Sequence, residues 1–120
     1  LGVLACVCDS NRDRAISFSQ KFSCPAYSFE QILNDNTLNG VIIATNANTH
    51  AKLACEALNA RKHVCVEKPL ALSMSSALSI KQCAINANKQ VMVGHLLQYH
   101  PAYVELKNFV NDGFIGFNST

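Results

Sequence analysis

The chain has 120 residues, 49% of them hydrophobic, and its 10 basic and 8 acidic residues leave a formal net charge of +2 at pH 7. This length suits one hydrophobic core, so a single domain or part of one is expected. The basic residues are scattered rather than gathered into a stripe, which argues against a nucleic-acid partner. No apolar run approaches the ~20 residues of a membrane span, and the first residues lack the features of a signal peptide. We therefore expect a soluble, cytoplasmic protein with no membrane partner.

Each of the six cysteines lies within an apolar segment: Cys6, Cys8, Cys24, Cys55, Cys65 and Cys83. In a short secreted chain six cysteines would suggest disulfide bonds. Here their positions favour reduced residues that pack as small hydrophobic side chains. A metal site would need a second close-spaced cysteine pair or a nearby histidine pair, so no metal is expected.

The chain alternates between segments typical of strands and of helices. Residues 4–8 form an apolar run of strand length that ends at the turn-forming residues 9–11, and residues 12–22 follow in a loosely helical pattern. A short helical patch at residues 29–33 comes next. Residues 40–44 are continuously apolar and β-branched in the middle, which predicts a strand covered on both faces and hence a parallel sheet.

Two further helix–strand pairs are predicted, followed by a last helix. From Asn48 a helix presents one apolar face and leads to a strand at residues 64–66, and Ser73 caps a helix that leads to a strand at residues 91–93. The expected buried residues of these helices are Leu53, Ala54, Ala57 and Leu58 in the first, Met74, Ala77, Leu78, Ala84 and Ile85 in the second, and Tyr99, Tyr103, Leu106, Phe109 and Val110 in the last.

Three β–α repeats followed by another strand predict an α/β fold with a doubly wound parallel sheet, because parallel neighbours need helical crossovers. Ligands of such sheets bind beyond the carboxyl ends of the strands. The polar residues that follow each predicted strand are therefore the candidates for function: Asp9, Thr45, Asn46, Glu67, Lys68 and His95.

Two of these positions allow a functional and a structural interpretation. Asp9 can accept hydrogen bonds from the ribose hydroxyls of NAD, or it can cap the helix that follows. Lys68 lies between Glu67 and Pro69 after an apolar strand. A lysine that is partly desolvated there can exchange a proton near neutral pH, whereas the alternative is a solvated loop pair with Glu67. His50 opens a helix, where a capping or solvent-facing role is favoured when it is taken alone.

Several segments match one known family in order and spacing: Val7-Cys8-Asp9, residues 41–45, Thr49-His50, Ala57-Leu58, Lys62-His63-Val64, residues 67–72 and Val93-Gly94-His95. With Glu67-Lys68-Pro69 as the most specific of them, the chain resembles the Gfo/Idh/MocA oxidoreductases, which have a Rossmann-type dinucleotide-binding domain. Residues 94–102 resemble more narrowly the branch that acts on UDP-N-acetylglucosamine-type sugars as 3-dehydrogenases.

The resemblance implies an NAD-dependent dehydrogenase or reductase of a sugar, which in this branch is nucleotide-linked, with NADP less favoured because of Asp9. It implies that Lys68 is the acid/base and that Pro69 follows a cis peptide bond. It also implies the residues near the cofactor: Asp9 at the adenosine ribose, Thr45, Asn46 and His50 along the dinucleotide cleft, Glu67 at the nicotinamide ribose, and His95 and Gln98 near the nicotinamide.

The resemblance also implies limits of the domain and two departures from the family pattern. Residues 1–113 correspond to a partial dinucleotide-binding domain whose first strand and glycine-rich loop would precede Leu1, and residues 114–120 begin the link to a substrate domain. The 120-residue chain alone is thus expected to be inactive, and the complete protein to be a homo-oligomer. Asn46 stands where a proline is common, and Arg61 where a glycine is usual. The alternatives are an NAD-dependent glycosidase of the same fold and a non-catalytic or decayed dinucleotide-binding fragment.

Overall fold

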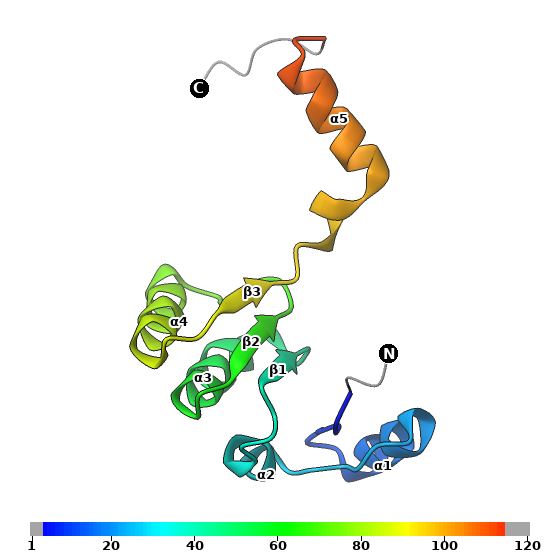
Figure 1. Ribbon diagram of the computed structural model, residues 1–120, viewed down its shortest axis with the longest axis vertical. Helices are drawn as coiled ribbons and strands as arrows, with labels where there is room; N and C mark the ends of the chain where they lie inside the picture. The colour runs from blue at the N-terminus through cyan, green and yellow to red at the C-terminus, as the bar shows by residue number, and fades with distance from the viewer. Residues whose placement is uncertain (1–3, 115–120) are drawn as a thin grey trace.

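The computed structural model describes residues 4–114 (Figure 1). In chain order its elements are α1 (Arg12–Phe22), α2 (Phe29–Asn34), β1 (Gly40–Ile43), α3 (Ala47–Asn59), β2 (His63–Val66), α4 (Met74–Ala87), β3 (Val91–Val93), the 3₁₀ helix η1 (Leu96–Tyr99) and α5 (Pro101–Asn111). Residues 1–3, and all but the first residue of the expected link at 114–120, lie outside the described residues.

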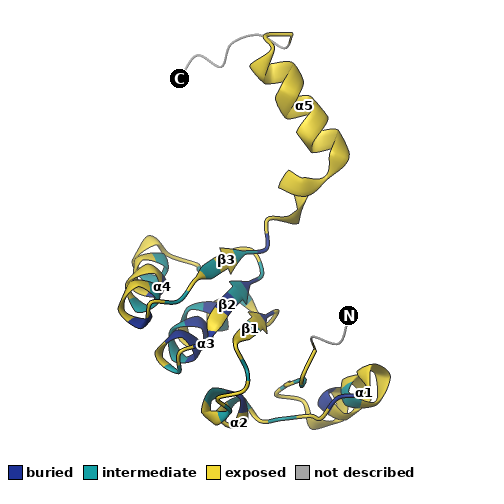
Figure 2. Ribbon diagram, viewed as in Figure 1, coloured by how far each residue is buried: buried dark blue, intermediate teal, exposed yellow. Residues whose placement is uncertain are grey.

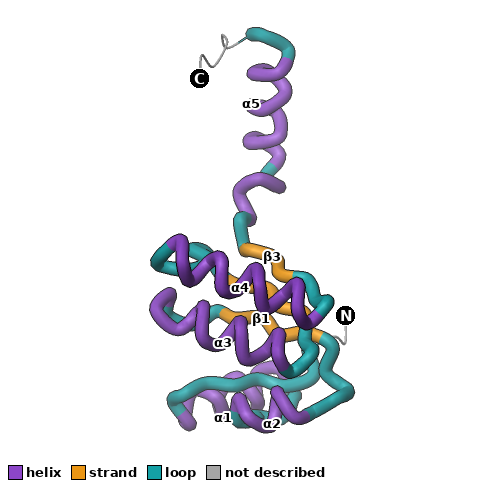
Figure 3. The backbone as a smooth tube through the Cα atoms, turned by 90° about the vertical axis from the view of Figure 1, so that its left-hand side faces the viewer, coloured by secondary structure: helices purple, strands orange, loops and turns teal. Residues whose placement is uncertain are grey.

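The three strands form a parallel sheet in the order β1-β2-β3, which confirms the predicted α/β fold. Ile43 is in register with Val66, and Val66 with Val93, so the three strands end at the same edge. The crossover helices α3 and α4 lie side by side on one face of the sheet (Figures 1 and 3).

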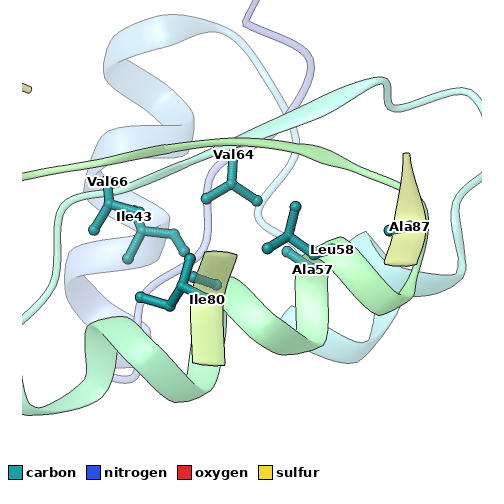
Figure 4. Packing of buried hydrophobic residues seen from close by; sticks show 8 residues of the cluster. Ile43, Ala57, Leu58, Val64, Val66, Ile80 and Ala87 are labelled. Atoms are coloured by element: carbon teal, nitrogen blue, oxygen red, sulfur yellow. The ribbon is translucent and has the colours of Figure 1, made fainter. Parts of the chain in front are cut away.

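The core lies between these two helices and the strands, as Figure 4 shows. Ala54, Ala57 and Leu58 of α3 are fully buried, which confirms the predicted face of this helix. They pack with Ile43 of β1, with Val64 and Val66 of β2, and with Ile80 and Ala87 of α4. The alanines leave room for the backbones of the helices to approach, and the larger aliphatic side chains fill the remaining space.

The buried face of α4 differs from the one predicted. Met74, Leu78 and Ile85 are exposed, and Ile80 and Ala87 are buried instead. Ala77 and Ala84 of the predicted face are half-buried. The face that packs against α3 is thus built mainly of alanines flanking Ile80, because small side chains permit close helix contact, and the bulkier residues lie outside it.

The opposite face of the sheet is open within residues 4–114. Ile42, Cys65 and Met92 are in register across the three strands, and Ile42 is 76% exposed. The prediction that β1 is covered on both faces is therefore wrong for the part of the chain that the structure describes. The continuous apolar sequence of β1 is nevertheless that of a strand with two faces to bury.

The strand predicted at residues 4–8 is reduced to a single parallel bridge between Val7 and Ala26. The Val7 N–H donates to the Pro25 carbonyl at 3.0 Å, and the Tyr27 N–H donates to the Val7 carbonyl at 2.8 Å. The segment has a neighbour on one side only among residues 4–114, so a longer ladder does not form. It ends beside α1, whose N-cap is Asn11.

Helix α5 has no buried residue, contrary to the prediction for the last helix (Figure 2). It extends away from the sheet, and η1 is its principal packing partner in the described chain. Tyr103, Phe109 and Val110 are all exposed, and Tyr99 belongs to η1 rather than to α5. The apolar residues of α5 do recur with helical spacing, but residues 4–114 contain no element that buries the face they form.

Candidate functional site

The carboxyl edge of the sheet gathers the residues that follow the three strands. Beyond the ends of β1 and β2, the Glu67 N–H donates to the Ile43 carbonyl at 2.9 Å, and the Gly94 N–H donates to the Val66 carbonyl at 2.8 Å. These bonds continue the ladder by one residue and fix the backbone at Glu67 and Gly94 relative to each other. This is the edge at which parallel α/β sheets bind ligands.

Glu67 is half-buried, and its carboxylate lies against the backbone of Gly94. A β-carbon at position 94 would lie 3.3 Å from Glu67 Oε1, tighter than most packing contacts of a β-carbon. The absence of a side chain at Gly94 therefore makes room for this carboxylate. The sequence motif contains Gly94, but this role was not predicted, since it requires knowing that β2 and β3 are neighbours.

Lys68 is exposed at this edge, and the Lys68–Pro69 peptide bond is cis, as the family resemblance implied. The expectation that Lys68 is partly desolvated is thus wrong within residues 4–114. The alternative of a side-chain pair with Glu67 is also not observed in the described chain, because Glu67 Oε2 instead accepts the backbone N–H of Lys68 at 3.2 Å. The Lys68 ammonium is thus not held by Glu67.

His50 is buried, with 1% of its surface exposed, so the capping or solvent-facing role favoured for it alone is wrong. Its Nδ1 lies 2.8 Å from the Pro69 carbonyl oxygen, and its Nε2 lies 3.0 Å from the Thr45 carbonyl oxygen. The ring therefore bridges the loop after β1 and the loop after β2. Both of its nitrogens are engaged by the backbone rather than presented to a ligand.

Thr45 and Asn46 are exposed at the start of α3, where Asn46 is the N-cap. The Thr45 hydroxyl lies 2.7 Å from the Thr49 hydroxyl, and the latter donates to the Asn46 carbonyl at 2.7 Å. Asn46 has φ −68°, a value that proline also adopts. At this position, where the family resemblance implies proline, Asn46 therefore keeps the turn in a proline-compatible shape.

His95 and Gln98 are exposed beyond β3. The His95 N–H donates to the Val93 carbonyl at 2.8 Å, and the Gln98 N–H donates to the His95 carbonyl at 3.3 Å. Gln98 therefore lies in the short η1 helix that leaves the carboxyl edge, and His95 is the N-cap of that helix.

Asp9 follows the Val7–Ala26 bridge and forms an ion pair with Arg14 in the first turn of α1. Its Oδ2 accepts from Arg14 Nε at 2.5 Å, and its Oδ1 accepts from Arg14 Nη2 at 2.9 Å and from the Asn11 N–H at 2.8 Å. The hydrogen bonds from Arg14, and then that from Asn11, lower the pKa of Asp9. The capping interpretation of Asp9 is wrong, since Asn11 is the N-cap. Arg14 was missed, although its spacing of five residues from Asp9 across a turn is a signal that the sequence contains.

A comparison with known protein families shows which family the chain belongs to. The profile of the oxidoreductase family with an NAD-binding Rossmann fold, GFO_IDH_MocA, matches residues 2–95. The chain belongs to this family. The chain is 33% identical, over 114 residues, to the inositol 2-dehydrogenase of Salmonella typhimurium. The aligned region covers 92% of this chain and 34% of that protein.

Two solved structures have the same fold as this chain. An NAD-binding protein from Listeria innocua is 31% identical with a TM-score of 0.87, covering 93% of this chain and 33% of that one. KijD10, a 3-ketoreductase from Actinomadura kijaniata in complex with TDP-benzene and NADP, is 26% identical with a TM-score of 0.85, covering 93% and 36%. The chain thus spans about a third of the length of the relatives it matches.

The residues at the carboxyl edge fit the dinucleotide of a Gfo/Idh/MocA protein, and the chain is an NAD-binding Rossmann domain. Glu67 presents a carboxylate at the sheet edge, and the exposed Thr45 and Asn46 lie at the start of α3. The Asp9 carboxylate lies beyond the separate N-terminal bridge and is bound by Arg14. Hydroxyl and carboxylate groups of this kind accept hydrogen bonds from ribose hydroxyls.

None of the helices in residues 4–114 is long and apolar enough to cross a membrane.

Proposed function

We propose that the full-length protein carrying this chain transfers a hydride between a nicotinamide dinucleotide and a secondary hydroxyl, or the corresponding ketone, of a sugar-like substrate. The observation that carries this proposal is the placement of Lys68 beside Glu67 at the carboxyl edge of an NAD-binding sheet. When bound, the nicotinamide accepts or supplies the hydride. The chain's own residues then have to bind the cofactor and move one proton.

Lys68 is the proposed acid/base of the reaction. In the oxidation, its neutral amine takes the hydroxyl proton as the C–H bond breaks and the ketone forms, and in the reduction its ammonium returns that proton to the carbonyl oxygen. Lys68 is available for this role because its side chain lies at the carboxyl edge and, within residues 4–114, its ammonium is not held by Glu67. His50 supports it indirectly by bonding the carbonyl of Pro69, the next residue.

The proposed substrate class is a cyclic polyhydroxylated molecule. The proteins that the chain resembles include an inositol 2-dehydrogenase and a 3-ketoreductase whose structure was solved in complex with TDP-benzene and NADP. The resemblance of residues 94–102 to enzymes of UDP-N-acetylglucosamine-type sugars favours the narrower proposal of a nucleotide-linked sugar. We propose that the complete protein is a homo-oligomer, as the family resemblance implies.

The deciding experiment measures NAD(H) absorbance with a panel of myo-inositol, free sugars and UDP-sugars. Full-length Lys68→Met is expected to bind NAD within about threefold of the parent and to lose about 100-fold in turnover, as for removal of a positioned acid/base. Lys81→Met, an exposed lysine on α4, is the matched control and should retain full turnover. Undiminished turnover in Lys68→Met would remove Lys68 from the mechanism, and activity on inositol but not on UDP-sugars would reject the narrower substrate.

A further inference from the structure

Cys55 of α3 and Cys83 of α4 lie on the faces that the two crossover helices turn toward each other. Both are half-buried, and both pack against the core cluster that the helices share. Cys55 precedes the fully buried Leu58 by one helical turn, and Cys83 follows the buried Ile80 by one turn. The two thiols therefore belong to the interface between α3 and α4 rather than to the outer surface of either helix.

The direction of the helices brings the two cysteines to the same height in this interface. Because the strands are parallel, α3 and α4 both begin at the carboxyl edge of the sheet and run side by side toward the other edge (Figure 3). At a rise of about 1.5 Å per residue, Cys55 lies about 12 Å along α3 from Ala47. Cys83 lies about 14 Å along α4 from Met74. The buried alanines between the helices let the backbones approach closely, and a disulfide requires Cα atoms roughly 4.4–6.8 Å apart.

The two thiols are neighbours that are not bonded to each other. Both are free cysteines in the described chain. Burial, then hydrogen bonding to Cys83 and repulsion between the two thiolates, raise the pKa of Cys55 to about 11. The thiolate is the reactive form of cysteine, so Cys55 alone would react slowly at neutral pH. A second thiol beside it makes the step that closes a disulfide intramolecular, and proximity accelerates such a step.

We propose that Cys55 and Cys83 are a redox modification site, at which a disulfide forms reversibly and joins α3 to α4. With glutathione disulfide as the oxidant, the thiolate of one cysteine attacks a sulfur of the oxidant and releases one glutathione. The other cysteine then attacks the mixed disulfide, so that the S–S bond between the helices forms and the second glutathione leaves. The two cysteine thiols are oxidised, the oxidant is reduced to two glutathione thiols, and these take up the two protons that the cysteines lose.

The bond changes the stability of the domain. It closes the chain between residues 55 and 83, a segment that contains β2 and most of α4. A cross-link of this kind restricts the unfolded chain and so stabilises the folded one. The oxidised protein should therefore melt about 5 °C or more above the reduced protein, and a thiol reductant should reverse the rise.

The test uses the native full-length protein and glutathione disulfide. After oxidation the remaining thiols are blocked, and mass spectrometry of a digest made without reductant shows which cysteines are joined. The expected product is a pair of peptides linked through Cys55 and Cys83, which separates on treatment with dithiothreitol. Thermal denaturation of the oxidised and reduced proteins gives the difference in melting temperature.

Cys55→Ala and Cys83→Ala should each abolish both the linked peptides and the rise in melting temperature, and alanine suits the interior of both helices. Cys65→Ala is the matched control, because Cys65 is a half-buried cysteine on the open face of the sheet. This variant should keep the linkage and the rise. Oxidised protein in which Cys55 and Cys83 stay unlinked, or are linked to other cysteines, would overturn the inference, whatever its activity with NAD(H). So would a linked protein that melts no higher than the reduced one, because the bond would then strain the packed helices.

Discussion

The buried ring of His50 lies 2.8 Å, through Nδ1, from the carbonyl oxygen of Pro69, nineteen residues along the chain. Its other nitrogen contacts the Thr45 carbonyl at 3.0 Å, so one side chain joins the loops that follow β1 and β2. A neutral imidazole carries one N–H and donates to one carbonyl, whereas a doubly protonated ring donates to both. In either state, His50 stabilises the loop that holds Lys68.

The first prediction concerns this bridge. His50→Phe keeps an aromatic ring but removes every donor, so it should lower the free energy of unfolding by about 2 kcal/mol, the cost of a buried polar group left without a partner. His63→Phe is the control, because His63 is exposed and accepts one surface hydrogen bond from the Gln90 N–H. Its cost should stay below about 1 kcal/mol. Urea denaturation measures the free energy of unfolding of both variants. Equal losses of stability would show that the buried His50 bonds contribute no more than the surface bond of His63.

The elements of the sheet could be predicted from the sequence because each follows a local pattern. The β-branched run at β1 and the helical spacing of Ala54, Ala57 and Leu58 are both confirmed. The buried face of α4 could not be assigned so simply, because hydrophobicity favours Met74 and Leu78 while the contact with α3 favours alanine. Close packing of two helices selects side-chain size, which a hydrophobicity pattern does not report.

The sequence predicted which residues lie at the candidate site better than it predicted what their side chains contact. Thr45, Glu67 and His95 follow successive strands, so their common edge follows from the parallel topology. The burial of His50 depends on the Pro69 loop, and the role of Gly94 depends on the neighbouring strand. Contacts between residues far apart in the chain produce no local sequence pattern. The role predicted for His50 was therefore wrong, and that of Gly94 was not predicted.

The second prediction tests the space that Gly94 leaves for Glu67. Gly94→Ala should move the Glu67 carboxylate by a few tenths of an ångström. If Glu67 binds the nicotinamide ribose, NAD affinity should fall by about three- to tenfold, as expected for a misaligned hydrogen bond. In a Glu67→Ala background the same substitution should cost nothing further, because the group it displaces is gone. Additive losses in the two backgrounds would show that Gly94 acts by another route.

The third prediction concerns the pH dependence of the Asp9–Arg14 pair. Hydrogen bonds from Arg14 and from the Asn11 N–H lower the pKa of Asp9 in the folded protein. The stability they contribute is therefore fully present above the ordinary pKa of an aspartate and is lost as the pH falls through the lowered folded value. An NMR titration of the Asp9 carboxyl carbon should show this lowered pKa.

Arg14→Ala should raise the pKa of Asp9 towards its ordinary value, although the bond from Asn11 remains. Arg12→Ala should leave the titration of Asp9 as it is in the parent. If removal of Arg14 did not move the Asp9 titration, the ion pair would not form in solution.

The last prediction concerns Arg61, which occupies a position where the family resemblance implies glycine. Its φ is +63°, in the left-handed region that costs an ordinary residue about 1 kcal/mol. In return, Arg61 Nη1 donates to the Ala87 carbonyl at 2.9 Å, near the end of α4. The loop thus keeps the backbone shape suited to glycine, and the arginine offsets the strain with a contact that glycine lacks.

Two substitutions separate these opposing effects. Arg61→Ala loses the hydrogen bond and keeps the unfavourable φ, so it should lower the free energy of unfolding by about 1 kcal/mol. Arg61→Gly loses the same bond but adopts a positive φ without steric cost, so its stability should lie close to that of the parent and above that of the alanine variant. Urea denaturation of the three proteins, with the slope of the transition checked for constancy, gives the comparison. Equal stabilities for the alanine and glycine variants would mean that residue 61 does not adopt the left-handed conformation in solution.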